Sequence, residues 1–533
     1  MVSTGTRWRQ LYRQLDEPAS WTHRNALMAI VLLGFLLRGY LLAAGHAFNV
    51  DTIRDEVNAL HYALSLLAGE PNAWYLAQPA LHDGHIPGPL WTLLVAAFYK
   101  LGGNTADGAL FWMMLLNSVV IYPFYLFASR LLPARAALFT TLFFAIAPWP
   151  IYYAAGLYNP LALPLLSVLL FWALWQTLNR DQSRAIFWVL LFSAMILQFH
   201  MVAIFYYPAI LLLLWLAPTR LNLRWLGAGL IAGTCIYLPY LFGEITHHWA
   251  NTRAVLSGSE KFNWGVLKFL TILPEMLSNH PGGWPGDTTA ELKDFGNRYF
   301  GAYGLLLGIN LISFGFALVF VYGFLRRFYR VLRQARFNLK TTLRDHRLTV
   351  FLGVLLVLPL LLYFLLGKDY ASRYSIIIFP LLFLLPALSL QRMQGAGIKR
   401  YIAYGLAVMF VCNIYVVWAF ALDQQRELTS EPQYLPAFYK LEKLYKALRH
   451  DAGPDRTIAV DLTHYPTAGN HYSEVASEAI PNYIAAYEAQ LPPRTTPRPP
   501  KHYLLTDALA QVPAGAKIVF QDNGLVIYTP PLP

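Results

Sequence analysis

Four charged residues stand together in the stretch FNVDTIRDEVNAL, residues 48–60. Asp51 and Asp55 are four residues apart, so a helix would place both carboxylates on one face, with Arg54 and Glu56 beside them. A positioned carboxylate can take a proton from an attacking hydroxyl or amine group. The same residues also suit an ordinary solvated helix start, where acidic side chains favour the positive end of the helix dipole. The spacing alone leaves both interpretations open.

Further polar residues stand at the ends of long apolar runs. His85 lies in a segment rich in glycine and proline, Asn159 lies in a Tyr-Asn-Pro sequence, and His200 directly follows an apolar run. A lone histidine in such a setting is commonly a core residue whose hydrogen bonds are satisfied within the protein. Imidazole and amide groups can also bind the hydroxyl groups of a substrate. These three residues are therefore candidate substrate contacts.

Two cations occur close together in the segment KDYASRY, residues 368–374. Basic residues at the ends of membrane spans commonly extend toward the lipid headgroups, which would explain Lys368 and Arg373 without a binding site. Paired cations that face a cavity at membrane level instead suit a phosphate group. We predict Lys368, Arg373 and Tyr374 as a phosphate-binding set, to which Arg54 is added from the acidic stretch.

Membrane helices must position these residues. Of 533 residues, 56% are hydrophobic and 13% are charged, and the mean hydropathy is +0.41. Soluble domains carry about 25% charged residues. Apolar runs of about 20 residues recur along the chain, and a helix of that length spans a bilayer. We predict an all-α polytopic membrane protein whose spans cover residues 25–44, 109–129, 136–153, 160–178, 185–200, 202–217, 225–243, 301–325, 348–366, 375–391 and 401–421.

The basic residues give this map an orientation. With the N-terminus in the cytoplasm, the cytoplasmic segments hold 21 basic and four acidic residues, and the opposite side holds 19 basic and 25 acidic residues. This distribution follows the positive-inside rule and explains the net charge of +12 without a nucleic-acid partner. We predict a cytoplasmic N-terminus (1–24), a transmembrane domain (25–421) with outer loops 45–108 and 244–300, and an extracytoplasmic α/β domain (422–533).

Two segments outside the spans have patterns of their own. Residues 87–101 are apolar but short, which predicts a helix along the membrane interface with Trp91 and Tyr99 as interfacial anchors. In the tail, LPAFYKLEKLYKALRH is predicted as a helix, and TIAVDL and KIVFQDNGLVIYT are predicted as strands. The proline-rich PPRTTPRPP, residues 492–500, is predicted as a stiff connector.

Several of these elements also occur together in a known superfamily. In order, they are an aspartate-containing stretch after the first apolar run, a GPLW sequence, a Tyr-Asn-Pro turn, a Gln-x-His pair and a late SRYSIIIFPLLFLLP. In this order the sequence resembles the C-type glycosyltransferase superfamily, and within it the protein O-mannosyltransferase and aminoarabinose-transferase group. The resemblance extends from residue 20 to about residue 420 and leaves the tail out.

The resemblance implies an integral membrane glycosyltransferase that transfers a sugar from a polyprenyl-phosphate-linked donor to an acceptor on the extracytoplasmic side, with inversion. The family's first-loop acid corresponds to Asp51, with Asp55 or Glu56 as a second carboxylate. Mannosyltransferases carry an adjacent Asp-Glu pair, which here is Asp55-Glu56, so the general base stays open between Asp51 and Asp55. The family's contacts with the lipid phosphate correspond to segment 368–374.

The expected cofactors and partners follow from this scheme. No cofactor is required, although the three acids of the first outer loop could bind a divalent cation. The two cysteines lie in separate apolar runs and have no metal-ligand spacing. The expected partners are the lipid-linked donor, a glycan, lipid or protein acceptor, and membrane lipids. The expected location is the bacterial plasma membrane. In bacteria with two membranes, this is the inner membrane.

Two other protein classes would also have many membrane helices. A lipid or glycan transporter or flippase tends to bury charges at mid-membrane depth and to contain inverted repeats. Here Arg38 is the main charge within a predicted span, and the sequence shows no repeat. A non-catalytic assembly or sensor protein would use its outer domain to bind a partner and would not need an acidic cluster beside a cationic loop.

Overall fold

The computed structural model describes most of the chain up to residue 453 and parts of the tail. The described residues are 17, 20–44, 50–79, 84–154, 156–178, 184–217, 222–257, 269–278, 289–365, 372–392, 396–430, 438–453, 456–461, 480–481, 483–485, 487–488, 498–506, 512–513, 516–522 and 525–529. Lys368 lies outside these residues. Asp51, Arg54 and Arg373 are described only by their backbone, so their side chains also lie outside.

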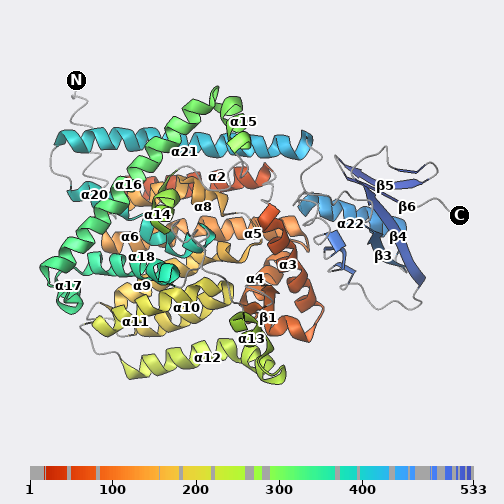
Figure 1. Cartoon of the computed structure of the whole chain (residues 1–533), viewed down its shortest axis with the longest axis horizontal. Coiled ribbons are helices and arrows are strands. Elements are labelled where there is room, and N and C mark those ends of the chain that lie inside the picture. Colours follow the sequence, from red (N-terminus) through yellow and green to blue (C-terminus); the bar gives the residue numbers. More distant parts are fainter. Residues whose placement is uncertain are drawn as a thin grey trace.

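Helices dominate the described chain (Figure 1). In the first part they are α2 (Trp21–Ala43), α3 (Val50–Leu67), α4 (Leu90–Leu101), α5 (Ala106–Val119), α6 (Ile121–Leu131), α7 (Ala134–Ile146), α8 (Pro148–Tyr152), α9 (Leu163–Thr177), α10 (Ala185–Phe199), α11 (Tyr207–Leu216) and α12 (Leu223–Thr246). In the second part they are α13 (Ala250–Ser257), α14 (Phe269–Leu277), α15 (Thr289–Phe300), α16 (Tyr303–Gln334), α17 (Leu339–Asp345), α18 (Arg347–Leu365), α19 (Phe379–Leu382), α20 (Leu385–Arg392), α21 (Ala396–Ser430) and α22 (Phe438–Ala452).

Short elements connect several of these helices. The 3₁₀ turns are η1 (Pro71–Trp74), η2 (Asn159–Ala162), η3 (Met201–Tyr206) and η5 (Ser372–Ile378). Two short strands, β1 (Leu76–Pro79) and β2 (His85–Pro87), pair antiparallel between α3 and α4. The described residues of the first outer loop, 50–79 and 84–108, therefore form helices, turns and strands that can hold side chains in fixed positions.

Eight helices in the described part are long and apolar enough to cross a membrane. They are Trp21–Ala43, Ala106–Leu131, Asn159–Thr177, Leu223–Thr246, Tyr303–Gln334, Arg347–Leu365, Tyr374–Gln391 and Tyr404–Asp423. Each coincides with one predicted span. The other three predictions, 136–153, 185–200 and 202–217, coincide with shorter apolar helices, and one of them is interrupted before Pro148 because proline cannot continue a helix at that point. The predicted fold class, a polytopic helical membrane protein, is confirmed.

The outer surface of the bundle suits a lipid environment. Leu230, Ile231 and Phe242 of α12 are exposed by more than half of their side-chain area. Exposed apolar side chains on a spanning helix cost nothing in a bilayer because lipid tails are equally apolar. In contrast, Tyr374–Gln391 is mostly buried inside the protein.

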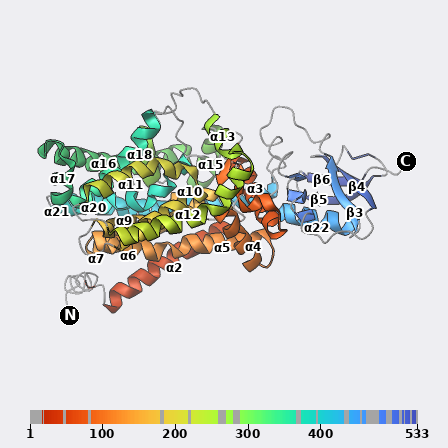
Figure 2. The ribbon, with the colours of Figure 1, turned by 90° about the horizontal axis from the view of Figure 1, so that it is seen from below.

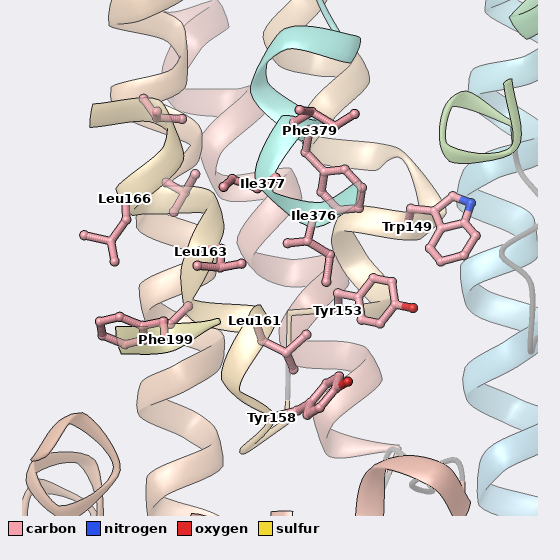
Figure 3. Packing of buried hydrophobic residues seen from close by; sticks show 14 of the residues in the cluster. Trp149, Tyr153, Tyr158, Leu161, Leu163, Leu166, Phe199, Ile376, Ile377 and Phe379 are labelled. Carbon is pink, nitrogen blue, oxygen red and sulfur yellow. The ribbon is translucent and has the colours of Figure 1, made fainter. Parts of the chain in front are cut away.

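The core near η5 is closely packed (Figure 3). Ile376 of η5, Leu163 of α9, Phe199 of α10 and Trp149 of α8 belong to one buried cluster. These helices come from distant parts of the sequence, so their packing fixes the turns that lie between them. One of these turns contains Asn159, and another contains His200.

The molecule is elongated, and different elements lie at its two ends. Figures 1 and 2 both show α17 at one end and strands β3 to β6 at the other, with α3 and α4 nearer the strands. The first outer loop and the tail therefore lie toward the same end of the bundle. The prediction that this end is extracytoplasmic, and the predicted domain limits, stay predictions.

The tail contains a four-stranded sheet made of β3 (Arg456–Asp461), β4 (Arg498–Thr506), β5 (Lys517–Asp522) and β6 (Leu525–Thr529). The strand order is β3-β4-β6-β5, and only the β3–β4 pair is parallel. The prediction of PPRTTPRPP as a connector is wrong for its last three residues, 498–500, because β4 begins at Arg498. The pairing with β3 is irregular at this point, between the Arg456–Arg498 and Ile458–Lys501 pairs, where two prolines supply no backbone donor.

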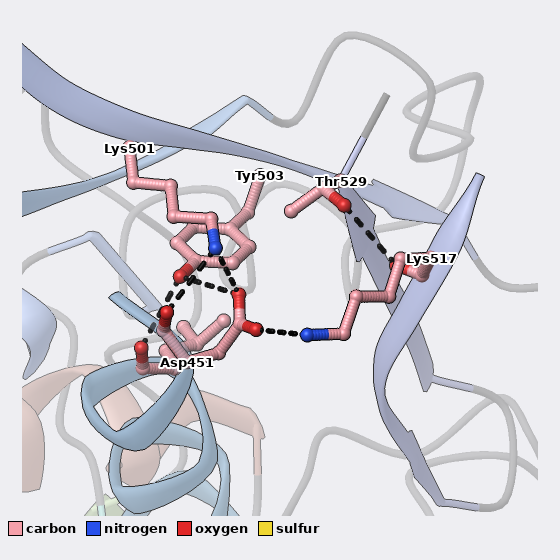
Figure 4. A network of polar contacts seen from close by, with 6 residues as sticks. Asp451, Lys501, Tyr503, Lys517 and Thr529 are labelled. Carbon is pink, nitrogen blue, oxygen red and sulfur yellow. Dashed lines mark hydrogen bonds and ion pairs between the residues drawn. The ribbon is translucent and has the colours of Figure 1, made fainter. Parts of the chain in front are cut away.

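One partly buried aspartate joins α22 to this sheet (Figure 4). The Asp451 carboxylate lies 2.7 Å from Lys501 Nζ and 2.5 Å from Lys517 Nζ, and it accepts a hydrogen bond from Tyr503 Oη at 3.1 Å. Burial raises the pKa of Asp451, but the hydrogen bonds from both lysines and Tyr503 outweigh this effect and lower the pKa to about 2. Asp451 therefore stabilises the tail as an ionised group.

Two aromatic residues of α4 are inside the protein. Trp91 is fully buried and Tyr99 is 2% exposed, so the prediction that they anchor the helix in the membrane interface is wrong. Tyr99 packs edge-on against Tyr487 of the tail, with ring centroids 6.4 Å apart. The 12 residues of α4 extend for about 18 Å, which is too short to cross the hydrocarbon core of a bilayer.

Candidate active site

The acidic stretch lies at the beginning of α3, which starts at Val50. This confirms that residues 51 and 55 are on one helical face. Asp55 is half-buried and is not without an interaction partner. The side chains of Asp51 and Arg54 lie outside the described part, so their roles stay predictions.

Glu56 is the acid that points into the protein. It is 1% exposed, and its Oε1 accepts a hydrogen bond from the backbone N–H of Leu157 at 3.1 Å. Its Oε2 is buried without a hydrogen-bond partner in the described structure. Burial raises the pKa of Glu56 well above its ordinary value, the Leu157 N–H opposes this, and the nearby Asp55 adds to it. Glu56 thus differs from Asp55 in being fully buried, where its charged form is disfavoured.

The turn that Glu56 contacts leaves no room for a larger residue at Gly156. A Cβ atom at Gly156 would lie 2.7 Å from Glu56 Oε1 and 2.8 Å from Leu161 Cδ1. The same turn is held from the other side, because Asn117 donates to the carbonyl of Ala154 at 3.2 Å. Glu56 therefore fixes α3 to a turn that is about one hundred residues away in the sequence.

Asn159 follows directly in this turn and is 5% exposed. Its Nδ2 donates to the carbonyl of Phe199 at 2.6 Å, and its Oδ1 accepts from Gln78 Nε2 at 3.3 Å. Gln78 Oε1 accepts in turn from Trp91 Nε1 at 2.9 Å. Both hydrogen-bonding groups of the Asn159 amide are thus used inside the protein, so Asn159 connects the first outer loop to the end of α10. The assignment of Asn159 as a substrate contact stays untested.

Gln198 makes a second connection at the same place. It is fully buried, its Oε1 accepts from the backbone N–H of Leu90 at 3.3 Å, and its Nε2 donates to the carbonyl of Ile236 at 2.9 Å. Gly88 passes close to it with φ +95°, and a Cβ atom there would lie 2.4 Å from the Gln198 amide. Only glycine combines this backbone conformation with this close approach.

His200 and Tyr374 are neighbours. His200 is the N-cap residue of η3, and its Nδ1 accepts from the backbone N–H of Val202 at 3.1 Å. The ring lies 5.5 Å from the ring of Tyr374, edge-on, and Tyr374 stacks on Tyr363 at 5.8 Å. A predicted substrate contact and a predicted phosphate contact thus come together, although they are 174 residues apart in the sequence.

His85 is positioned through its backbone. Asn251 of α13 accepts from the His85 N–H at 2.6 Å and donates to the His85 carbonyl at 3.1 Å. Glu244, which is fully buried, accepts from the backbone N–H groups of Asn251 and Thr252 at 3.2 and 2.9 Å. The His85 ring lies 5.9 Å from Tyr62 of α3, and burial lowers the pKa of His85. Residues of the outer loop 244–300 thus hold His85, in the outer loop 45–108, in place.

A series of contacts therefore runs from the acidic stretch to η5. Glu56 contacts the turn at Leu157, Asn159 contacts the end of α10, and His200 packs against Tyr374. The segment with Lys368 lies outside the described residues, and so does the side chain of Arg373. The convergence of the acids and the cations on one pocket therefore stays a prediction for these residues.

Sequence reasoning missed Gln78, Gln198, Glu244 and Asn251 as positioning residues. Gln198 was visible as a polar residue at the end of an apolar run. Gln78 and Asn251 have partners 81 and 166 positions away, so no local spacing relates them, whereas Glu244 contacts residues only seven and eight positions later. Arg38 also has a structural role, since its Nη1 donates to the carbonyls of Gly34 and Ala145 at 3.0 and 2.9 Å. Arg38 thus links α2 to α7.

A metal site is not visible in the described part. No group of three or more histidine, cysteine, aspartate or glutamate side chains there is arranged to hold a metal ion. The side chain of Asp51 lies outside the described residues, so the predicted absence of a metal stays a prediction.

Comparisons with known proteins add information on the fold. The sequence matches no protein-family model and no curated protein. The structure of ArnT from Cupriavidus metallidurans in the apo state covers 95% of this chain and 98% of its own, with a TM-score of 0.56 and 12% identity. This chain has the ArnT fold. The resemblance inferred from the sequence is confirmed for the fold, and it extends through the tail that the sequence motifs left out.

Two further structures are also similar. ArnT from Cupriavidus metallidurans bound to undecaprenyl phosphate covers 94% of this chain and 97% of its own, with a TM-score of 0.52 and 13% identity. The oligosaccharyltransferase of Archaeoglobus fulgidus in the apo form covers 92% of this chain and 70% of its own, with a TM-score of 0.46 and 13% identity.

Proposed function

We propose that this protein is an integral membrane glycosyltransferase that uses a polyprenyl-phosphate-linked sugar as its donor. The observation that carries the proposal is the ArnT fold over nearly the whole of both chains, together with the ordered network that joins α3 to η5. The similar ArnT structure with bound undecaprenyl phosphate supports a lipid phosphate as the leaving group of the donor.

The proposed reaction forms one bond and breaks one bond at the anomeric carbon. A hydroxyl or amine group of the acceptor attacks this carbon, its proton passes to a carboxylate of α3, and the bond from the carbon to the phosphate oxygen breaks. The polyprenyl phosphate leaves with the bonding electron pair. In-line attack inverts the configuration at the anomeric carbon. A positioned base contributes about 10²–10⁴-fold to the rate of such a step.

We assign the general base to Asp51 or Asp55. Asp55 is half-buried on the helical face that it shares with Asp51, and an acid there can keep its charge more easily than a fully buried one. Glu56 is less accessible to an acceptor, since it is 1% exposed and its Oε1 already accepts from the backbone N–H of Leu157. We therefore change the role of Glu56 from a second catalytic carboxylate to a positioning residue for the turn at Leu157.

Cations would stabilise the charge that grows on the leaving phosphate. We assign this role to Lys368 and Arg373, with Tyr374 as a further hydrogen-bond donor and Arg54 orienting the acids beside the phosphate. The neighbouring His200 and the ordered Asn159 turn support a site at this place. His85 is assigned to the acceptor side, since the middle outer segment holds it beside α3.

The remaining assignments concern location and partners. We propose that the end of the bundle with α3 and the tail sheet faces away from the cytoplasm in a bacterial plasma membrane. The acceptor is a glycan, lipid or protein, and the reaction proceeds without a metal. The charge distribution over the predicted loops supports this orientation.

The full-length protein in detergent or nanodiscs would be incubated with a panel of polyprenyl-phosphate sugars, and release of polyprenyl phosphate would be measured. We expect release with at least one donor. We expect Asp51→Asn or Asp55→Asn to lower the rate by at least 100-fold. Asp345→Asn is the matched control, because Asp345 is exposed on α17 at the other end of the molecule. Full rates in both test variants, with normal membrane insertion, would exclude the carboxylate mechanism.

The phosphate assignment needs a separate measurement. We expect Lys368→Gln and Arg373→Gln to raise the KM for the donor more than the KM for the acceptor, because each removes a charge that binds the phosphate. Arg344→Gln, on the exposed surface of α17, is the control for the loss of one positive charge. An unchanged donor KM in both test variants would remove this assignment.

A further inference from the structure

We propose that residues 326–347, which we call the basic surface, bind the phosphate headgroups of anionic membrane lipids. The basic surface comprises the end of α16, the whole of α17 and the first residue of α18. It lies at the end of the molecule opposite the tail sheet (Figure 1). The proposal is independent of the proposed sugar transfer, because it concerns a different part of the protein and a different ligand.

The basic surface is rich in positive charge that the described protein does not neutralise. It contains eight basic residues and one acidic residue. The acid, Asp345, pairs with Arg344, with Nε and Oδ1 3.0 Å apart. Five other basic residues are exposed and form no ion pair within the described part of the chain. They are Arg326, Arg330, Arg333, Arg336 and Lys340. Their charges are therefore available to an anionic ligand.

The position of these charges along α16 matches the depth of lipid headgroups. The helix has 32 residues, and its apolar part from Tyr303 to Leu325 extends for about 33 Å. This length is close to the thickness of the hydrocarbon core, which is about 30 Å. Arg326 and the residues after it therefore follow directly where a spanning helix leaves the hydrocarbon. The apolar part of α18 begins just after Arg347, so both helices meet the headgroup region at the basic surface.

Two aromatic side chains stand among the cations. Tyr329 is 54% exposed and Phe337 is 59% exposed, and their ring centroids are 6.4 Å apart. Aromatic rings are enriched at the boundary between lipid and water. Here the rings would enter the headgroup region while the neighbouring cations contact phosphate groups. A surface that binds soluble polyanions would gain nothing from exposed rings at this depth.

The turn between the two helices is well defined. Arg336 and Phe337 both have positive φ angles, of 51° and 60°, which are strained for residues with side chains. The Asn338 side chain compensates by accepting from the backbone N–H of Thr341 at 3.1 Å, and it thereby caps α17. Thr342 and Leu343 are buried against the bundle. The cations of α17 are thus held beside those of α16.

The test compares three double variants of the full-length protein. R330Q/R333Q removes two charges from the basic surface, R330K/R333K keeps both charges, and K100Q/K293Q removes two exposed charges elsewhere. Binding of phosphatidylglycerol and of phosphatidylcholine to the delipidated protein in neutral detergent would be measured by native mass spectrometry and by thermal stabilisation. Heparin would serve as the soluble polyanion.

We expect R330Q/R333Q to bind phosphatidylglycerol about 30-fold more weakly, which corresponds to about 2 kcal/mol for two charges at about 1 kcal/mol each. The lysine variant and the control pair should bind it normally, and phosphatidylcholine should bind equally to all four proteins. An equal loss in R330Q/R333Q and K100Q/K293Q, or no loss in either, would overturn the proposal. Strong binding of heparin with no preference for phosphatidylglycerol would also overturn it.

Discussion

The contact between Glu56 and Leu157 allows a sharp test of which acid carries the charge. Glu56→Ala would leave the buried Leu157 N–H without an acceptor, which costs about 1–3 kcal/mol, and would remove the Cγ methylene group, which is worth about 0.8 kcal/mol. The expected loss of stability is thus about 2–4 kcal/mol. Glu56→Gln keeps both the shape and the acceptor oxygen, so we expect stability within about 1 kcal/mol of the natural protein.

The difference in stability between Glu56→Gln and the natural protein should change with pH in a defined direction. The pKa of Glu56 is raised in the folded state, so ionisation opposes folding as the pH rises above the ordinary pKa of the side chain. Glutamine cannot ionise. We therefore expect Glu56→Gln to become more stable relative to the natural protein as the pH increases from 4 to 7, as measured by thermal unfolding.

Sugar transfer would be measured in the same variants, below their unfolding temperatures. We expect Glu56→Gln to retain at least half of the natural rate with an unchanged pH profile, and Glu56→Ala to lose activity as the turn moves. Gly156→Ala should also lose activity, because its Cβ atom would overlap Glu56 Oε1, and overpacking of this kind costs about 1–3 kcal/mol. A stable Glu56→Gln protein with activity at least 100-fold lower would refute the reasoning, since it would show that the charge of Glu56 is essential.

Four other substitutions and one pH titration test the network and the tail. Asn159→Leu leaves the Phe199 carbonyl unsatisfied, so we expect a loss of about 1–3 kcal/mol in thermal unfolding, whereas an unchanged protein would contradict the buried network. Asn251→Ala frees both backbone groups of His85, so amide hydrogen exchange at residue 85 should become faster, and equal exchange would argue against the clamp. Asp451 stabilises the tail above its usual pKa of 3.8, and this contribution should disappear as the pH falls toward 2. Lys501→Met should cost about 1 kcal/mol, and Lys517→Met less, because Lys517 is 70% exposed; equal losses would contradict this ranking.

The sequence was informative where a local pattern determines structure. Apolar runs of spanning length predicted the membrane helices, and the four-residue spacing predicted that a helix would place Asp51 and Asp55 on one face, as α3 does. Both signals act within a few turns of helix, so one sequence is enough to detect them. The order of polar motifs along the chain also predicted the fold to which it is similar.

The sequence was misleading or uninformative where contacts between distant segments determine the environment of a residue. Trp91 looks like an interfacial anchor, because an aromatic residue beside an apolar run gives the same pattern whether lipid or protein covers it. Strand β4 was missed because the prolines at its start suggested a connector. The bond between Gln78 and Asn159 joins residues 81 positions apart, and no local pattern encodes it.

The aromatic contact between Tyr99 and Tyr487 packs the tail against α4, which belongs to the first outer loop. A shortened chain that ended after α21 would expose a phenol ring that the complete protein keeps almost entirely covered. Such a chain would thus be a poor reference for the complete protein, since a loss of the proposed activity could arise from a loosened α4 as easily as from a missing contact with the proposed acceptor. Exchanging Tyr487 alone for a smaller residue would separate these two effects while keeping the tail in place.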